Sequence, residues 1–234
     1  MSALGGAVLL ALALVTCEAE PRLRDDGVVP VVLVHGYGGD SSMMSAIAER
    51  LREEGHEVVP VDLPLAGIGD IEGSVEVVAA AVDETRAPEV DLVGFSAGGV
   101  VARAYAGSVD EEDRPRVVVT LASPHHGTKL AAAAGELCTG ACEQLAPGSA
   151  FLEELNEPDE TPPGTEFVSV WSASDRVVTP PRSAVLDGAV NVRLQDLCPG
   201  SRAGHADLLR DPVVLEVLLR ALAGELGSVD CAAL

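Results

Sequence analysis

Aromatic residues are scarce in this chain: phenylalanine, tyrosine and tryptophan together make up 3% of its 234 residues. Aliphatic side chains and glycine must therefore fill the core, and small residues there let backbone segments pack closely. Apolar residues account for 47% and charged residues for 22%, close to ordinary globular usage. A chain of about 200 residues, without its first two dozen, suits one domain with a sizeable core.

Basic residues are also few, and Lys129 is the single lysine. Fifteen basic groups stand against 37 acidic ones, which gives a formal net charge of −22. Such a charge repels phosphate, so it excludes nucleic-acid binding and disfavours electrostatic binding to anionic membranes. The acidic surface either gives solubility or suits a salty environment in which repulsion is screened. Neither explanation identifies a substrate.

The apolar run near the N-terminus, residues 4–15, is too short to span a bilayer and matches the apolar core of a secretory signal. We expect residues 1–24 to be a signal peptide or lipoprotein signal and residues 25–234 to form a single domain. A short helix packed on the domain is the alternative. Leu14-Val15-Thr16-Cys17 resembles the lipobox of bacterial lipoproteins, although Thr16 stands where Gly or Ala is usual. The protein is therefore expected to be secreted, or exported and attached to the membrane through a lipid on Cys17.

Cysteine usage fits export, because disulfides persist in oxidising compartments. Cys17 is the odd one of five. Cys138 and Cys142 are four residues apart, within reach of a disulfide on one turn. Cys198 and Cys231 then pair by elimination, although four cysteines allow three connectivities. Five free buried thiols in a cytosolic protein are the alternative.

Apolar runs rich in β-branched residues alternate with helical patterns along the chain. The predicted strands cover 28–34, 57–62, 90–95, 116–121, 166–171 and 189–194, and the predicted helices cover 41–54, 75–85, 97–107 and 206–223. Internally apolar strands suit a mainly parallel sheet with helices on both faces. The alternation predicts a doubly wound α/β fold. Residues 124–163 break the pattern, and we expect a small cap-like excursion there.

The segment Gly94-Phe95-Ser96-Ala97-Gly98 matches G-x-S-x-G between a predicted strand and a predicted helix. On such a sharp turn, side chains two residues before and after the serine would collide, so glycine is needed at both positions. The turn lifts the Ser96 hydroxyl clear of the sheet. The Ala97 N–H, at the helix N-terminus, then points at a developing oxyanion. A chance serine in a glycine-rich turn is the alternative.

A second glycine-rich loop, His35-Gly36-Tyr37-Gly38-Gly39, follows the first predicted strand. Its Tyr37 N–H is the expected second donor to the oxyanion. We interpret His35 as a structural residue that hydrogen-bonds this loop. The loop lacks the G-x-G-x-x-G spacing of a dinucleotide-binding turn, which argues against a nucleotide cofactor.

A serine nucleophile needs a base, and the base needs a carboxylate to orient it. In this fold the chain order is serine, acid, histidine. His205 lies after the last predicted strand and before the final helix, which makes it the expected base. Asp175 follows the strand 166–171 and is the expected acid, with Asp196 as the credible rival. Asp187 precedes a strand and should lie at the opposite sheet edge.

His125 and His126 follow another strand end, in Ser123-Pro124-His125-His126-Gly127-Thr128. Their place in the chain makes them unlikely bases, and we expect them to line the substrate pocket or cap the following segment. Two adjacent residues point apart on a regular strand, and no H-E-x-x-H or paired C-x-x-C motif is present. We therefore expect no metal site.

These motifs together resemble the secreted triacylglycerol lipases and esterases of actinobacteria, within the α/β-hydrolase superfamily. The resemblance covers roughly residues 30–221 and includes the 135–156 stretch. It implies hydrolysis of fatty-acyl carboxylic esters through an acyl-enzyme on Ser96, with no cofactor, and it implies export and disulfides. The expected partner is a small-molecule or lipid ester, and we expect a monomer.

The triad alone leaves other activities open, because one fold serves many chemistries. A thioesterase, amidase or acyltransferase on the same scaffold is the main alternative. A non-catalytic binding protein is a further alternative, although the intact set of nucleophile, acid, base and oxyanion loop argues against it.

Overall fold

The computed structural model describes residues 27–227, 229 and 231. The expected signal segment, with Cys17, lies outside the described residues. The strands are β1 (Val31–Val34), β2 (Val58–Val61), β3 (Asp91–Phe95), β4 (Val117–Leu121), β5 (Glu166–Trp171) and β6 (Val190–Arg193). The α-helices are α1 (Ser45–Glu53), α2 (Ile71–Thr85), α3 (Ala97–Ser108), α4 (Lys129–Ala134), α5 (Ala141–Gln144), α6 (Ala150–Asn156), α7 (Leu194–Leu197) and α8 (Pro212–Leu222). The 3-10 turns are η1 (Ser41–Met44), η2 (Pro64–Gly67), η3 (Glu111–Asp113), η4 (Gly135–Leu137), η5 (Pro181–Ala184) and η6 (Ala206–Leu209).

The six strands form one parallel sheet in the order β2-β1-β3-β4-β5-β6. β1 lies between β2 and β3, so the chain turns outward in opposite directions from β1 and β3. In parallel sheets the loops at the carboxyl ends of two such strands part and leave a crevice. The predicted α/β-hydrolase architecture, a parallel sheet with helices on both faces, is confirmed.

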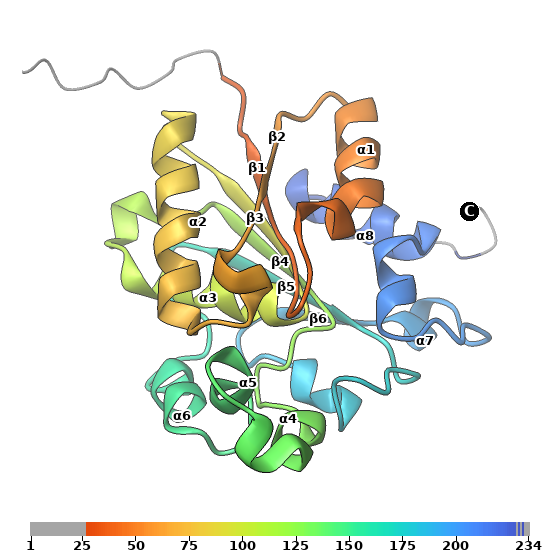
Figure 1. Cartoon of the computed structure of the whole chain (residues 1–234). Helices are drawn as coiled ribbons and strands as arrows, with labels where there is room; N and C mark the ends of the chain where they lie inside the picture. Colours follow the sequence, from red (N-terminus) through yellow and green to blue (C-terminus); the bar gives the residue numbers. More distant parts are fainter. Residues whose placement is uncertain (1–26, 228, 230, 232–234) are drawn as a thin grey trace, which may run out of the picture.

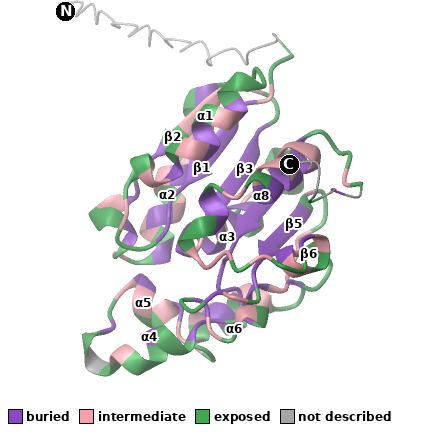
Figure 2. Ribbon diagram, turned by 90° about the vertical axis from the view of Figure 1, so that its right-hand side faces the viewer, coloured by how far each residue is buried: buried purple, intermediate pink, exposed green. Residues whose placement is uncertain are grey.

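Two apolar layers enclose the sheet, because alternate residues of a strand point to opposite faces. Val31 and Leu33 of β1 pack with α1 and α8, whereas Val32 and Val34 pack with α2 and α3. Figure 1 shows these two helix pairs on opposite sides of the sheet. The strands of the sheet centre are buried on both faces (Figure 2), as their continuous apolar runs predicted.

The predicted final helix over 206–223 is two elements, which corrects that prediction. η6 ends at Leu209, and α8 begins at Pro212. A proline at the first helical turn has no N–H to donate to a preceding residue, so it starts a helix readily but does not continue one. Asp211 caps α8, since its Oδ1 accepts from the N–H groups of Val213 and Val214 at 2.9 and 3.3 Å.

Residues 124–163 carry the short helices α4, α5 and α6, which lie together below the carboxyl edge of the sheet in Figure 1. A disulfide joins Cys138 to Cys142 of α5, and a second joins Cys198 to Cys231. Both pairs are those expected from spacing and elimination. Within the described part of the chain, no helix combines the length and apolar character needed to cross a bilayer.

Candidate active site

The candidate nucleophile lies on the turn between β3 and α3. Ser96 has φ 54° and ψ −125°, a positive φ that residues other than glycine rarely adopt. A Cβ at Gly94 would lie 2.4 Å from the Gly99 Cα, and one at Gly98 would lie 2.3 Å from the His35 carbonyl oxygen. Backbone cannot yield to such overlaps, so both flanking positions require glycine, as the motif predicted.

Three side chains from separate loops form a linear hydrogen-bonded chain. Ser96 Oγ lies 3.0 Å from His205 Nε2, and His205 Nδ1 lies 2.8 Å from Asp175 Oδ2. Because the carboxylate can only accept, Nδ1 carries the ring proton and Nε2 is free to accept from the serine hydroxyl. The structure thus brings together the three residues that the sequence indicated as nucleophile, base and acid.

The acid is held in place by its own neighbours. Asp175 is 5% exposed, and its Oδ1 accepts from the N–H groups of Val177 and Val178 at 2.8 and 3.0 Å. This leaves Oδ2 for His205. The His205 ring also packs against Phe95, with ring centroids 4.8 Å apart. Acid and base are therefore oriented before any substrate binds.

The loop after β1 reaches the nucleophile from the other side. A Cβ at Gly36 would lie 3.0 Å from the Ser96 Cβ, so the two backbones are in close contact. Tyr37 and Ala97 both line the cavity that contains Ser96, and neither N–H donates to another described residue. Two free backbone donors beside a serine hydroxyl can stabilise a tetrahedral oxyanion.

His35 is fully buried and holds this loop. Its Nε2 accepts from the Leu63 N–H at 2.9 Å, so its Nδ1 carries the proton and donates to the Gly36 carbonyl at 2.8 Å. Gly38 N–H donates to the Ala66 carbonyl at 2.8 Å. The prediction of a structural role for His35 is confirmed.

A cavity of about 440 Å³ opens at Ser96. None of the described side chains that line it is charged, and most are apolar. They come from the loop after β4, from the segment that carries α4, η4 and α5, and from the loop after Asp175: Pro124, Thr128, Leu130, Ala131, Ala133, Ala134, Leu137, Cys142, Leu145, Val177 and Val178. Such a cavity suits a hydrocarbon chain next to the reacting hydroxyl.

The two adjacent histidines do not reach this cavity, which corrects the expectation that they line the substrate pocket. His125 is fully buried beneath the loop, where its Nε2 lies 3.1 Å from Thr120 Oγ1. His126 faces a separate depression, in which its Nε2 lies 2.7 Å from Glu160 Oε1. The chain turns at Gly127, whose φ is +78°, and it is Pro124 and Thr128 that line the cavity instead.

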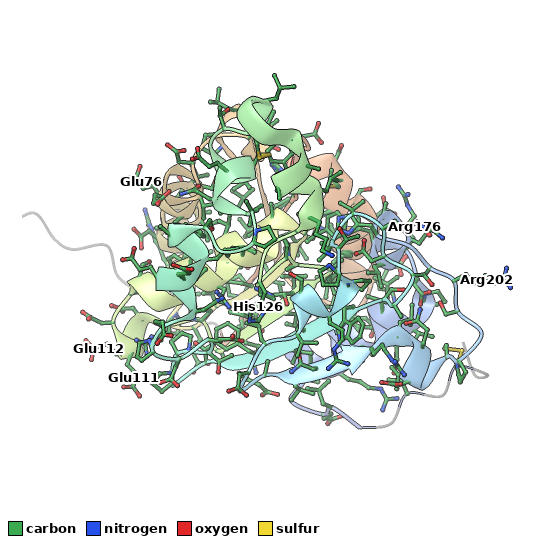
Figure 3. The ribbon with its side chains drawn as sticks, turned by 90° about the horizontal axis from the view of Figure 1, so that it is seen from below. Glu76, Glu111, Glu112, His126, Arg176 and Arg202 are labelled. Atoms are coloured by element: carbon green, nitrogen blue, oxygen red, sulfur yellow. A yellow bond between two sulfur atoms is a disulfide. The ribbon has the colours of Figure 1, made fainter. Side chains whose placement is uncertain are left out.

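Neither rival acid approaches the base. Asp196 is exposed and pairs with Arg193 three residues before it. Asp187 precedes β6 and therefore lies toward the amino edge of the sheet, as expected. Figure 3 views the molecule from below and labels Arg176 and Arg202, which lie on the loops of Asp175 and His205 on the same side.

Two features were not predicted from the sequence: the α4 residues that line the cavity, and the burial of Arg103. The available signals were the four alanines 131–134 within the excursion, and an arginine inside the apolar run of a helix. Both signals are differences in composition. Neither indicates which face of a helix lines a cavity.

Comparison with solved structures identifies the fold. The fold matches lipase B of Aspergillus fumigatus with a TM-score of 0.74 and 20% identity, over 84% of this chain and 53% of that one. It matches the mature lipase BlEst2 of Bacillus licheniformis with a TM-score of 0.67 and 20% identity, over 87% and 96%. An extracellular α/β-hydrolase of Paenibacillus matches with a TM-score of 0.52 and 16% identity, over 82% and 98%. The protein therefore has the α/β-hydrolase fold.

The sequence comparisons identify the family. The family model for palmitoyl protein thioesterase matches residues 30–159, more than half of the chain, and the chain belongs to this family. A curated relative is the dihydrolipoyllysine-residue acetyltransferase component of the acetoin cleaving system of Pseudomonas putida, 35% identical over 93 residues. The match covers 37% of this chain and a quarter of the length of that relative.

Proposed function

We propose that this protein is a serine hydrolase of fatty-acyl esters, with Ser96 as nucleophile, His205 as base and Asp175 as the acid that orients it. The observation that carries the proposal is the unbroken chain of hydrogen bonds from Ser96 through His205 to Asp175. The apolar cavity at Ser96 and the family match support the acyl substrate class.

The reaction proceeds by two acyl transfers. His205 Nε2 takes the Ser96 proton while Oγ attacks the ester carbonyl carbon, and the N–H groups of Tyr37 and Ala97 stabilise the resulting oxyanion. His205 then gives that proton to the leaving group, the bond to it breaks, and an acyl-enzyme remains. Water, deprotonated by His205, attacks the acyl carbon of the acyl-enzyme. The bond from that carbon to Ser96 Oγ breaks, His205 returns the proton to Oγ, and the fatty acid leaves. Asp175 stabilises His205 while it is charged.

A thioester is the second candidate substrate, because the matching family is described as a palmitoyl protein thioesterase. The same steps serve both substrates, with a thiol in place of the alcohol as leaving group. The residues that line the cavity surround the acyl part of the substrate. The ester and the thioester share that part, so the lining does not favour one of them.

Hydrolysis of p-nitrophenyl esters of increasing acyl length, by the protein and by Ser96→Ala, tests the proposal. We expect activity on long chains that falls by at least about a thousandfold in the variant. Residual activity near that of the parent protein would contradict the role of Ser96. Palmitoyl N-acetylcysteamine and the matching oxygen ester, compared by kcat/KM, then decide between thioesterase and esterase.

We further propose that the protein is exported and acts as a monomer. Two disulfides support export, because such bonds are rare in reducing compartments. Attachment through a lipid on Cys17 is the alternative to release. Mass spectrometry of the protein from its producing cells distinguishes a lipid-modified Cys17 from a cleaved, unmodified N-terminus.

A further inference from the structure

The candidate acid and base lie on separate loops, so the contact between them depends on how these loops are held together. We call residues 172–178, which follow β5 and contain Asp175, the acid loop. Residues 198–205, which follow α7 and end at His205, are the base loop. β5 and β6 are neighbours in the sheet and α7 follows β6 directly, so the two loops start close together.

Gln195 of α7 is bonded to both loops. Its Oε1 accepts from the Ala173 N–H of the acid loop at 2.9 Å, and its Nε2 donates to the Ser201 carbonyl of the base loop at 3.3 Å. Nε2 also donates to Ser172 Oγ at 2.8 Å. Because the Ala173 N–H can only donate, it fixes which end of the amide is oxygen, and both hydrogens of Nε2 are then used.

Ser172 makes a second connection between the loops. Its side chain is fully buried, and its hydroxyl donates to the Ala203 carbonyl of the base loop at 2.5 Å. The same oxygen accepts from Gln195 Nε2 and, at 3.1 Å, from the Ser174 N–H. A serine hydroxyl offers one hydrogen and two lone pairs, so all of its bonding capacity is used. The Ser172 carbonyl also accepts from the Asp175 N–H at 3.1 Å, which joins this network to the acid.

We propose that Gln195 is a positioning residue, which together with Ser172 clamps the acid loop to the base loop and holds Asp175 against His205. Neither side chain is among the described residues that line the cavity at Ser96, so both act through the loops and not on the acyl chain. The inference rests on the proposed hydrolase function. His205 must stay aligned in both acyl transfers, so loss of the clamp slows the formation and the hydrolysis of the acyl-enzyme alike.

Gln195→Met, which has a similar length but no amide, tests the clamp by ester hydrolysis. We expect kcat to fall about tenfold and KM to change by less than about twofold, because both steps slow together while the acyl cavity is untouched. Ser172→Ala should act in the same direction. The double variant should lose little more than the stronger single variant, because both residues act through one network. An unchanged kcat in Gln195→Met, or losses that multiply in the double variant, would overturn the proposal.

The matched control is Ser169→Ala. Ser169 is also fully buried and lies on β5, but its hydroxyl donates to the Ala184 carbonyl at 2.6 Å, outside both loops. The control removes the same kind of hydrogen bond as Ser172→Ala, so it should also lower the free energy of unfolding while kcat stays within about twofold of the parent value. An equal fall of kcat in the control would mean that lost stability explains the effect, and it would contradict the clamp.

Proton NMR reports the contact between Asp175 and His205 without any hydrolysis. The Nδ1 proton of His205, held between imidazole and carboxylate atoms 2.8 Å apart, resonates far downfield and is identified by its absence in His205→Ala. We expect this signal in the parent protein and its weakening or loss in Gln195→Met. An unchanged signal in Gln195→Met, or no signal in the parent protein, would overturn the clamp. A signal that depends on Gln195 in a protein that hydrolyses no ester would overturn the proposed function and leave the clamp standing.

Discussion

At the scale of single residues, the site depends on one backbone conformation that its neighbours must accommodate. Ser96 keeps its positive φ because β3 and α3 fix the chain on both sides and because the Ser96 N–H donates to the Leu121 carbonyl at 2.8 Å. A strained residue of this kind costs about 1–3 kcal/mol. In this conformation the turn exposes the Ser96 hydroxyl to His205. The turn can form only if the residue at position 98 is small.

Two glycines of α3 should respond oppositely to alanine. Gly98→Ala places its Cβ 2.3 Å from backbone oxygens of β1 and its following loop, so we expect a loss of about 3 kcal/mol or more in the free energy of unfolding. Gly107→Ala meets nothing within 4 Å and should stabilise the helix by up to about 1 kcal/mol. Urea unfolding measures both values. Similar losses for the two variants would contradict the steric argument.

His125 gives the molecule a pH-dependent stability. Burial, with Arg103 and His126 nearby, lowers the pKa of His125 well below its usual value of 6.5. The unfolded chain therefore binds a proton at this residue at a higher pH than the folded chain does. The stability from keeping His125 neutral is present above about pH 6.5 and is lost as the pH falls.

His125→Gln should remove this dependence. Between pH 6.5 and 5.5, we expect the unfolding free energy of the parent protein to fall more steeply than that of the variant, by up to about 1 kcal/mol per pH unit. Denaturant unfolding at a series of pH values measures the two slopes. Parallel curves would show that His125 titrates as it does in the unfolded chain.

At the scale of secondary-structure elements, α4 forms a wall of the cavity at Ser96. Ala131, Ala133 and Ala134 line the cavity, whereas Ala132 is exposed and does not. Small side chains on this wall leave room beside Ser96, so a larger side chain there would narrow the cavity.

Ala134→Phe should therefore narrow the cavity and shift the preferred ester toward shorter acyl chains, with kcat/KM for a long-chain ester falling about tenfold relative to a short-chain one. Ala132→Phe adds the same ring on the exposed face and should leave the ratio unchanged. An equal shift in both variants would mean that α4 acts through its stability and not through the shape of the cavity.

The strands and the hydrogen-bonded arrangement of Ser96, His205 and Asp175 could be predicted because each leaves a local signal. Buried parallel strands are continuous apolar runs, and Ser96, Asp175 and His205 each follow a strand end in the expected order. Pro212 is a local signal for the start of α8. The apolar pattern continues across this residue, and for that reason one helix was predicted over 206–223. The position of His125 was not predictable, because a turn decides whether a side chain at a strand end faces the cavity or the core. Arg103 required knowledge of what packs on α3.

At the scale of the whole molecule, the two disulfides constrain very different lengths of chain. Cys138–Cys142 closes a four-residue separation within the cap, and Cys198–Cys231 links residues 33 apart and ties the C-terminal segment to the body. Loop-closure entropy makes the longer bridge worth about 4 kcal/mol and the shorter about 2 kcal/mol.

We expect Cys198→Ala with Cys231→Ala to lower the unfolding free energy more than Cys138→Ala with Cys142→Ala does. Guanidinium unfolding of the two double variants, both without reductant, gives the comparison. The cap variant should instead show its larger effect on ester hydrolysis, because Cys142 lines the cavity. A larger loss of stability from the cap pair would contradict the entropic argument.

Covalent labelling with a fluorophosphonate, followed by peptide mass spectrometry, tests the roles of Ser96 and His205 most directly. We predict one adduct per molecule, on Ser96, which is absent in Ser96→Ala and forms far more slowly in His205→Ala, because the hydroxyl then lacks its base. An adduct on another residue, or an unchanged labelling rate in His205→Ala, would contradict the assignment of Ser96, His205 and Asp175 as the catalytic triad.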